Sequence, residues 1–237
     1  MWRRRLGPRL GLDSFGRTGR RAAGAAAAAA APRGPAPGKL RLDATRRWLE
    51  RVVIAERLCP FAAAVREEPR LRLTASEAAS ADDAVAEVAA EAALLVRGLR
   101  GDAEGAPETT LLVFDERRPF VAEWLDLVRL SWRLQSEALL AQGYAEELQI
   151  VLFHPLAVHS AYAQGDEDAA DFSLRAPHPT VHLLREADVL EAVRRYPDAA
   201  QIPSRNKAAL RQQGLAACAA RLEACRSGGE EGGPGLR

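Results

Sequence analysis

The run LQIVLF at residues 148–153, followed by His154 and Pro155, is the stretch that decides the fold. A short apolar run of this kind is typical of a buried strand. A loop of about two dozen residues comes next, with polar stretches such as DED at 166–168, and a second strand-like run, TVHLL at residues 180–184, closes it. All four histidines of the chain lie between residues 154 and 182. A loop of this length inside a compact domain is usually functional or disordered, so we expect a functional site beside it.

Strands and helices alternate on both sides of this stretch, which indicates an α/β fold. We predict a single layered domain over residues 43–226, with a mixed, mostly parallel four-stranded sheet and flanking helices. The strands at 110–114 and 148–153 are expected to run parallel, joined by a right-handed crossover helix. The connection to the strand at 180–184 lacks a helical pattern, so this strand is expected to pair antiparallel or at a sheet edge. The other elements expected from apolar spacing are a helix around 48–53, a strand at 71–73, a helix at 85–99 and a last helix opened by Pro203.

The first 42 residues differ in composition from the rest of the chain. They hold nine arginines and one lysine against a single acid, and they lack periodic large apolar residues. Such a segment cannot bury enough surface to offset its ordering entropy, so we expect a disordered leader. Arginine-rich, acid-poor leaders are typical of organelle transit peptides, which favours the mitochondrial matrix or the plastid stroma over the cytoplasm. The alternative is a disordered tail without a targeting role, and the Gly-rich residues 227–237 are expected to form a flexible tail.

The body of the protein is acidic, because residues 43–237 carry a net charge of −8 and the first 42 carry +9. Nucleic-acid binding therefore receives no electrostatic support. No apolar run reaches the roughly 18 residues that a membrane helix needs, so no membrane association is expected. Three cysteines are too few for a disulfide framework, which favours a reducing compartment.

His154 and Cys59 are candidate catalytic residues. His154 follows a buried strand, where ligands bind in open α/β sheets, and is a candidate general acid or base; the alternative is a structural histidine. Cys59 lies at a helix end before Pro60 and is a candidate nucleophile or a packed core residue, and the helix dipole there does not activate a thiol. The remaining histidines, His159, His178 and His182, are alternative metal ligands together with His154. Their spacing matches no ligand motif, so we assign no metal site.

Three arginines are candidates for binding an anion, because guanidinium pairs with carboxylate or phosphate in a bidentate geometry. They are Arg175, Arg185 and Arg205. Asn206 lies with Arg205 in the first turn of the last expected helix, where backbone amides favour anions. The alternative for Arg185 is a surface ion pair with Glu186, which would contribute little. The sequence has no P-loop, GxGxxG, CxxC, GxSxG or HExxH motif, so several large enzyme classes lack support.

Five short motifs occur in an order that resembles a known family. They are LCPFA at 58–62, FHP at 153–155, RAPHP at 175–179, HLLRE at 182–186 and IPSRN at 202–206. The chain resembles the uncharacterised, mostly bacterial family called domain of unknown function 1415 over residues 43–215. That family has no established activity, so the resemblance implies a domain-sized unit and no substrate. The positions that match its motifs are Cys59, His154, Arg175, His182, Arg185, Glu186, Arg205 and Asn206.

Two departures from the family pattern bear on the site. The family usually has asparagine where this chain has Arg57, and tyrosine where it has His178. The second departure weakens the four-histidine metal hypothesis. A bacterial type of domain behind an arginine-rich leader also favours an organelle protein of a eukaryote.

The leading hypothesis from the sequence is a small enzyme acting on an anionic small molecule, with a pocket at the carboxyl end of the third strand. Cys59, His154, His182 and Glu186 are its candidate catalytic residues, and Arg175, Arg185, Arg205 and Asn206 its candidate substrate-binding residues. The second hypothesis is a non-catalytic module that binds a ligand or a protein in an organelle. The third is a metal-dependent enzyme that uses the histidine cluster. The sequence identifies no cofactor.

Overall fold

The computed structural model describes residues 36–159, 167–196 and 198–229. Residues 1–35 of the expected leader and residues 230–237 of the expected tail lie outside this range. The first helix, α1 (Pro37–Trp48), begins six residues before the expected domain boundary at residue 43. In the described part of the chain, no helix has the length and apolarity to cross a membrane.

The centre of the fold is a four-stranded sheet with the strand order β1-β2-β4-β3. β1 (Leu71–Ala75) and β2 (Thr109–Val113) are parallel, whereas β4 (Thr180–Arg185) pairs antiparallel with both β2 and β3 (Leu148–Phe153). The prediction of an α/β fold with a mixed four-stranded sheet is confirmed, but two of the three pairings are antiparallel, so the expectation of a mostly parallel sheet is wrong.

The position of β4 explains this difference. β2 and β3 point in the same direction, as expected, but β4 lies between them instead of at an edge. The described part of the β3–β4 connection contains a single short helical turn, η3 (Ala169–Ser173). A parallel crossover needs a longer helical segment, so the chain returns antiparallel beside β3.

One face of the sheet is covered by α3 (Ala81–Leu99) and by α4 (Trp124–Arg133), which continues as the π-helical segment η2 (Leu134–Leu140). α3 begins at a capping box in which Ser80 and Asp83 each accept a hydrogen bond from the other's backbone amide. Apolar side chains of these helices pack on alternate strand residues, because side chains of a strand point to opposite faces in turn. The strand residues in this core are Leu112, Leu148, Val181 and Leu183.

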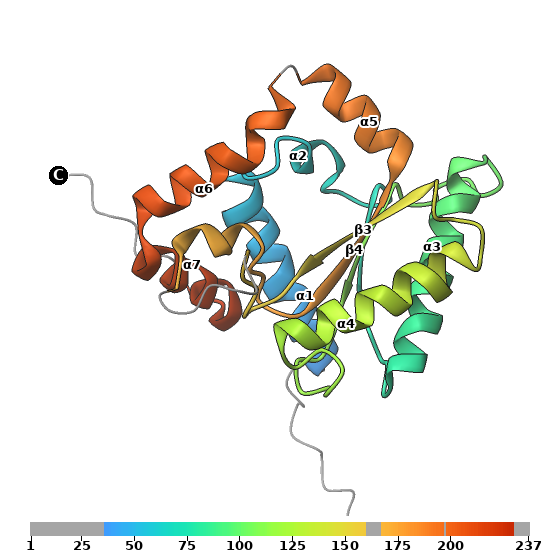
Figure 1. The fold of residues 1–237 in the computed structure, drawn as a ribbon, viewed down its shortest axis with the longest axis horizontal. Coiled ribbons are helices and arrows are strands. Elements are labelled where there is room, and N and C mark those ends of the chain that lie inside the picture. Colours follow the sequence, from blue (N-terminus) through green and yellow to red (C-terminus); the bar gives the residue numbers. More distant parts are fainter. Residues whose placement is uncertain (1–35, 160–166, 197, 230–237) are drawn as a thin grey trace, which may run out of the picture. The chain divides into compact units, whose positions relative to one another are not determined.

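The other face is covered by α1, its continuation η1 (Leu49–Ile54), and the two last helices, α6 (Ile202–Gln213) and α7 (Leu215–Ser227). Figure 1 shows α1, α6 and α7 on one side of the sheet and α3 and α4 on the other. Pro203 lies in the first turn of α6, as expected, and Gly214, with a φ of 87°, separates α6 from α7. The core of this face includes Trp48, Leu49, Val52, Leu111, Phe172 and Leu210.

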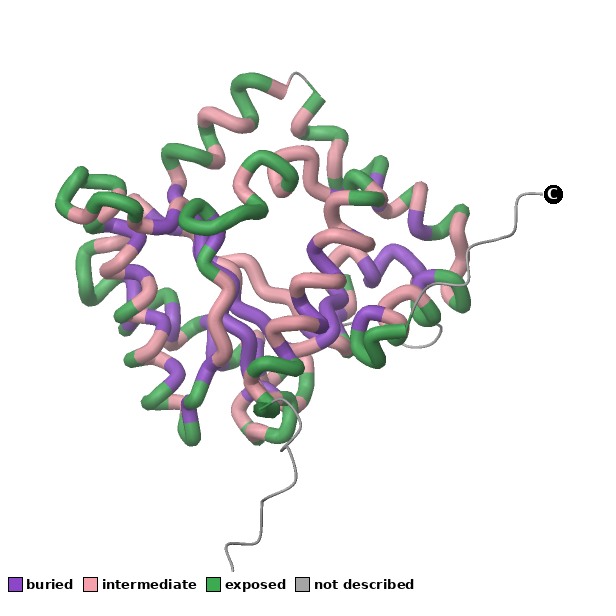
Figure 2. The backbone as a smooth tube through the Cα atoms, turned by 180° about the vertical axis from the view of Figure 1, so that it is seen from behind, coloured by how far each residue is buried: buried purple, intermediate pink, exposed green. Residues whose placement is uncertain are grey.

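Part of this second face is left without a packed core. The short helix α2 (Ala62–Val65) and the longer α5 (Glu186–Arg195) lie above it, and neither contains a buried residue. Figure 2 shows the contrast, with buried backbone along the strands and the adjoining helices but only intermediate and exposed residues in α5. The space between the sheet, η1, α2 and α5 is where the candidate site lies.

Candidate functional site

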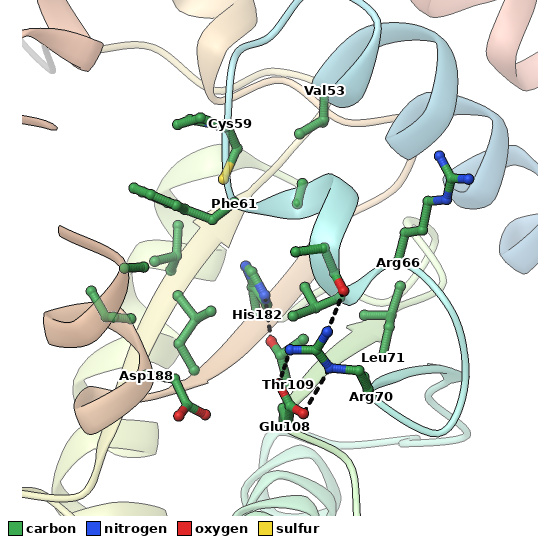
Figure 3. A pocket seen from close by; sticks show the side chains of 18 of the residues that line it. Val53, Cys59, Phe61, Arg66, Arg70, Leu71, Glu108, Thr109, His182 and Asp188 are labelled. Atoms are coloured by element: carbon green, nitrogen blue, oxygen red, sulfur yellow. Dashed lines mark hydrogen bonds and ion pairs between the residues drawn. The ribbon is translucent and has the colours of Figure 1, made fainter. Parts of the chain in front are cut away.

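A cavity of about 710 Å³ lies over the second face of the sheet. Side chains of all four strands form its floor, and η1, the turn at residues 59–61, α2 and α5 form its walls. Figure 3 shows this cavity from close by. Most of its lining is apolar, and few polar groups lie within it. A volume of this size with a few polar groups among apolar walls is typical of a small-molecule site.

His182 lies on the floor of the cavity, on the central strand β4, and Thr109 lies beside it on β2. Nε2 of His182 is 2.7 Å from the hydroxyl oxygen of Thr109, and that hydroxyl is 2.8 Å from the carbonyl oxygen of Leu183. The carbonyl oxygen can only accept, so the Thr109 hydroxyl donates its single proton to it. The hydroxyl oxygen must then accept from His182, which places the imidazole proton on Nε2.

The imidazole of His182 is neutral at physiological pH. Its enclosure by apolar walls lowers its pKa to about 4, because burial disfavours the charged form. Nδ1 of the neutral ring therefore carries a lone pair, and no described residue donates a hydrogen bond to it. The imidazole points into the cavity (Figure 3), so this nitrogen is a hydrogen-bond acceptor or a base for whatever occupies the cavity.

Cys59 faces the same cavity from the opposite wall. It lies on the turn between η1 and α2 and is partly exposed, whereas Cys218 and Cys225 are buried in the second core. Figure 3 shows Cys59 and His182 pointing into the cavity from the turn and from β4. The structure therefore brings two of the predicted catalytic residues to one cavity.

Arg205 and Asn206 support the turn that carries Cys59. Nη2 of Arg205 donates to the carbonyl oxygen of Arg57 at 3.1 Å, and Nδ2 of Asn206 donates to that of Leu58 at 2.6 Å. Nη1 of Arg205 also donates to the hydroxyl of Tyr196, another residue of the cavity wall. The motifs at 58–62 and 202–206 thus meet through backbone hydrogen bonds, and the two α6 side chains hold the wall of the cavity instead of facing its interior.

Charged residues gather at one edge of the cavity. Arg70 forms a bidentate ion pair with Glu108, at 2.7 and 2.8 Å, which holds the pKa of Glu108 below its usual value. Asp188 of α5 lies nearby; burial raises its pKa, and the neighbouring charge of Glu108 acts in the same direction. Four arginines and three acids line the whole cavity, so its edge is slightly basic although the body of the protein is acidic.

His154 lies away from the cavity, and only 1% of its surface is exposed. Its Nε2 is 2.9 Å from the carbonyl oxygen of Val121, and its Nδ1 accepts from the backbone amide of Leu156 at 3.0 Å. Both ring nitrogens therefore have partners, and burial lowers the pKa of the ring. This geometry is that of the structural histidine that the sequence left as an alternative.

The four histidines do not meet. His159 bonds to Ser173 at 2.7 Å and His178 to Glu116 at 2.8 Å, so each of the four imidazoles has a partner of its own. Across the described ranges, no three histidine, cysteine, aspartate or glutamate residues gather closely enough to hold a metal ion.

The other predicted site residues, two for substrate binding and Glu186 for catalysis, have structural partners. Arg175 donates to the carbonyl oxygen of Ala157 and lies 4.7 Å from the Phe172 ring centre. Arg185 borders the cavity, but its guanidinium donates to the carbonyl oxygen of Pro107. Glu186 is not part of the lining, and its carboxylate accepts from the side chain of Gln149.

We expected a pocket at the carboxyl end of β3 beside His154. Val151 and Phe153 of β3 line the cavity, but His154 does not, and it bonds instead to the carbonyl oxygens of Val121 and Leu174. The cavity instead extends toward the carboxyl end of β4. Thr109, Arg70, Glu108 and Asp188 also line the cavity and were not predicted from the sequence. Strand alternation would have placed Thr109 beside His182 only if the pairing of β2 with β4 had been known.

Comparison with known proteins gives one match. The model of the family described as Protein of unknown function (DUF1415) matches residues 41–220 of the 237. No curated protein and no solved structure matches the chain. All five motifs, including the two that meet at the Cys59 turn, fall within the matched range. The chain therefore belongs to the DUF1415 family.

Proposed function

We propose that this protein is an enzyme that binds a small molecule with an apolar body in the 710 Å³ cavity and uses His182 as a general base. One observation carries this proposal. The Thr109 hydroxyl fixes the imidazole with its proton on Nε2, which leaves the Nδ1 lone pair in a cavity large enough for a substrate. A base must reach the proton that it abstracts, and Nδ1 is the ring nitrogen placed to do so.

Cys59 and the charged edge give this site its other chemical groups. The thiol faces the cavity and is a nucleophile or a contact surface for the substrate. An anionic group on the substrate, which the sequence led us to expect, would lie at the edge of the cavity that Arg70 and Arg66 border. Proton abstraction at Nδ1 produces an imidazolium, and its Nε2–H retains the Thr109 oxygen as acceptor.

The test is substrate depletion by the full-length protein in an extract of small metabolites, followed by mass spectrometry. His182→Gln is the informative variant, because glutamine can still donate to the Thr109 hydroxyl but has no titratable nitrogen. We expect the wild-type protein to consume a compound that His182→Gln leaves intact. Leu190→Ser is the matched control, since Leu190 is 56% exposed on α5 and is not part of the cavity lining.

Equal depletion by the wild-type protein and His182→Gln would contradict the assignment of the base. Binding of a compound without any depletion would favour the non-catalytic module. One further observation favours that second candidate: Trp132 and Leu140 are 73% and 66% exposed along α4 and η2, as a protein-binding surface would be. Analytical ultracentrifugation of wild type and Trp132→Ser would show whether this face mediates self-association.

Localisation in an organelle is a separate part of the proposal. It rests on the composition of residues 1–42, which carry nine arginines, one lysine and one acid. A fluorescent protein fused behind residues 1–42 should enter mitochondria or plastids, and a fusion with the arginines of this segment replaced by glutamine should not. Diffuse cytoplasmic fluorescence of the first fusion would contradict the transit peptide.

A further inference from the structure

We infer that the group that the ligand presents to His182 is an uncharged hydroxyl. The substrate is therefore an alcohol or phenol with an apolar body. This inference rests on the proposed function and names the substrate class of the same site.

The Leu183 carbonyl, the Thr109 hydroxyl and the neutral His182 ring share two protons between them. The Leu183 carbonyl oxygen has none to give, so it takes the proton of the Thr109 hydroxyl at 2.8 Å. The Thr109 oxygen can then only accept from Nε2 of His182 at 2.7 Å. Because the neutral ring carries one proton, Nδ1 has none and is an acceptor alone. The backbone of β4 therefore sets, through Thr109, what the cavity can recognise at His182.

An acceptor at the floor of an apolar cavity selects among ligand head groups. A carboxylate or phosphate would place a second acceptor against the Nδ1 lone pair, with no proton between them. An ammonium would bring a proton but would have to leave water for a cavity lined mainly by apolar side chains, which is costly for a charged group. A hydroxyl brings a proton without a charge. It is also a group from which a general base takes a proton: the O–H bond breaks, the N–H bond forms, and the electron pair stays on oxygen.

The walls near His182 fit an apolar, flat or branched body. Phe153 lies beside the imidazole, with ring centres 6.2 Å apart, and Trp48 packs edge-on against Phe153 at 5.1 Å. Phe61 on the facing wall packs edge-on against Tyr196 at 5.9 Å. Aromatic walls of this kind favour an aromatic or bulky aliphatic ligand.

A matched pair of probes tests this inference on the full-length protein. 2-Naphthol and 2-methoxynaphthalene share one ring system, and only the first has an O–H donor. We expect 2-naphthol to bind about tenfold more tightly, since one net hydrogen bond of this kind has roughly that effect on an equilibrium constant.

Two variants show whether the preference comes from His182. His182→Phe keeps a flat ring but removes Nδ1, so 2-naphthol and 2-methoxynaphthalene should bind this variant equally well. Thr109→Val removes the acceptor of the Nε2 proton, so the imidazole is no longer held in one tautomer and the preference should fall. Leu190→Ser, an exposed position on α5 that is not part of the lining, should keep the tenfold preference.

Nitrogen-15 NMR of the ligand-free protein reads the tautomer directly and does not depend on any variant folding. We expect the His182 signals of a protonated Nε2 and an unprotonated Nδ1 near pH 7. Equal binding of the two probes by the wild-type protein would overturn the inference and leave the base at Nδ1 intact. A proton on Nδ1 would overturn both the inference and the assignment of His182 as the base. Failure of every probe to bind the wild-type protein would instead overturn the proposed function.

Discussion

The hydroxyl of Thr109 joins Nε2 of His182, at 2.7 Å, to the carbonyl oxygen of Leu183, at 2.8 Å, across two antiparallel strands. The two side chains lie 73 positions apart in the sequence, yet together they determine which imidazole nitrogen carries the proton. The sheet therefore supplies both the position and the protonation pattern of the central polar group in the cavity.

The stability of the protein should depend on pH through His182. The pKa of His182 is about 4 in the folded protein and near its ordinary value of 6.5 in the unfolded chain. Between these values the unfolded chain binds the proton more tightly, so the free energy of unfolding falls as the pH falls. His182→Gln has no such group. From pH 7 to pH 5 the variant should gain about 2 kcal/mol of stability relative to wild type, measured by urea denaturation. The pKa values of His154 and His159 are also lowered, but both residues are present in both proteins. A difference in unfolding free energy between the two proteins that stays constant from pH 7 to pH 5 would therefore contradict the lowered pKa of His182.

His154 should be needed for stability and not for ligand binding, because its geometry is that of a structural residue. His154→Ala leaves the Val121 carbonyl and the Leu156 amide without partners and opens a space in a buried position, which should cost about 2–4 kcal/mol. The cavity should still bind the fluorescent probe 1-anilinonaphthalene-8-sulfonate with unchanged affinity under conditions where the variant is folded. If His154→Ala lost probe binding but kept the stability of the wild-type protein, His154 would be a binding residue and not a structural one.

The sequence predicted the positions of the strands well, because β2, β3 and β4 each contain a short apolar run and β1 begins with alternating apolar and polar residues. It did not predict the sheet order, since the antiparallel return of β4 depends on the length and packing of a connection that has no periodic pattern. Four histidines within residues 154–182 suggested one cluster. In the structure, His182 points from a strand into the cavity, whereas His154 follows a strand and packs against the Val121 backbone. Closeness in sequence could not distinguish these two environments.

The predicted anion-binding pair of α6 illustrates a second limit. Arg205 and Asn206 have the residue types that bind anions at a helix start, but their donors go to the carbonyl oxygens of Arg57 and Leu58. Those oxygens become available because the turn before Cys59 leaves them outside helical hydrogen bonding. A backbone acceptor 148 residues away in the sequence has no signature in the residue types.

Cys59 should be the cysteine that reacts first in the native protein. Cys218 and Cys225 are 3% and 0% exposed, whereas Cys59 borders the cavity. Iodoacetamide should therefore modify the wild-type protein at Cys59, as located by peptide mass spectrometry, and should not modify Cys59→Ser at a comparable rate. Asn206→Ala releases the Leu58 carbonyl and should both raise the rate at Cys59 and cost about 1–3 kcal/mol of stability. An unchanged rate in a destabilised Asn206→Ala would mean that the turn does not depend on this bond.

Arg57 occupies a backbone conformation that its residue type disfavours. Its φ is 53°, in the left-handed region, where asparagine is favoured over other residues with a side chain. The family resemblance implied asparagine at this position, and the backbone geometry gives a physical reason for that residue type. Arg57→Asn should raise the free energy of unfolding by about 0.5–1 kcal/mol, measured by urea denaturation. Arg57→Ala keeps the strain and is the matched control, so an equal gain in both variants would point to loss of the arginine side chain instead.

Gly98 and Gly38 should respond to alanine with opposite signs. A Cβ at Gly98 would overlap the Arg185 guanidinium and the Cβ of Ala106, so Gly98→Ala forces Arg185 out of place and should cost about 1–3 kcal/mol. A Cβ at Gly38 of α1 would meet Ala75 at 3.5 Å, an ordinary contact, so Gly38→Ala should gain up to about 1 kcal/mol from helix propensity. Thermal denaturation of both variants measures the pair. Because Arg185 ends β4 beside the cavity, Gly98→Ala should also weaken 2-naphthol binding. An unchanged affinity would mean that the position of Arg185 does not determine the shape of the binding site.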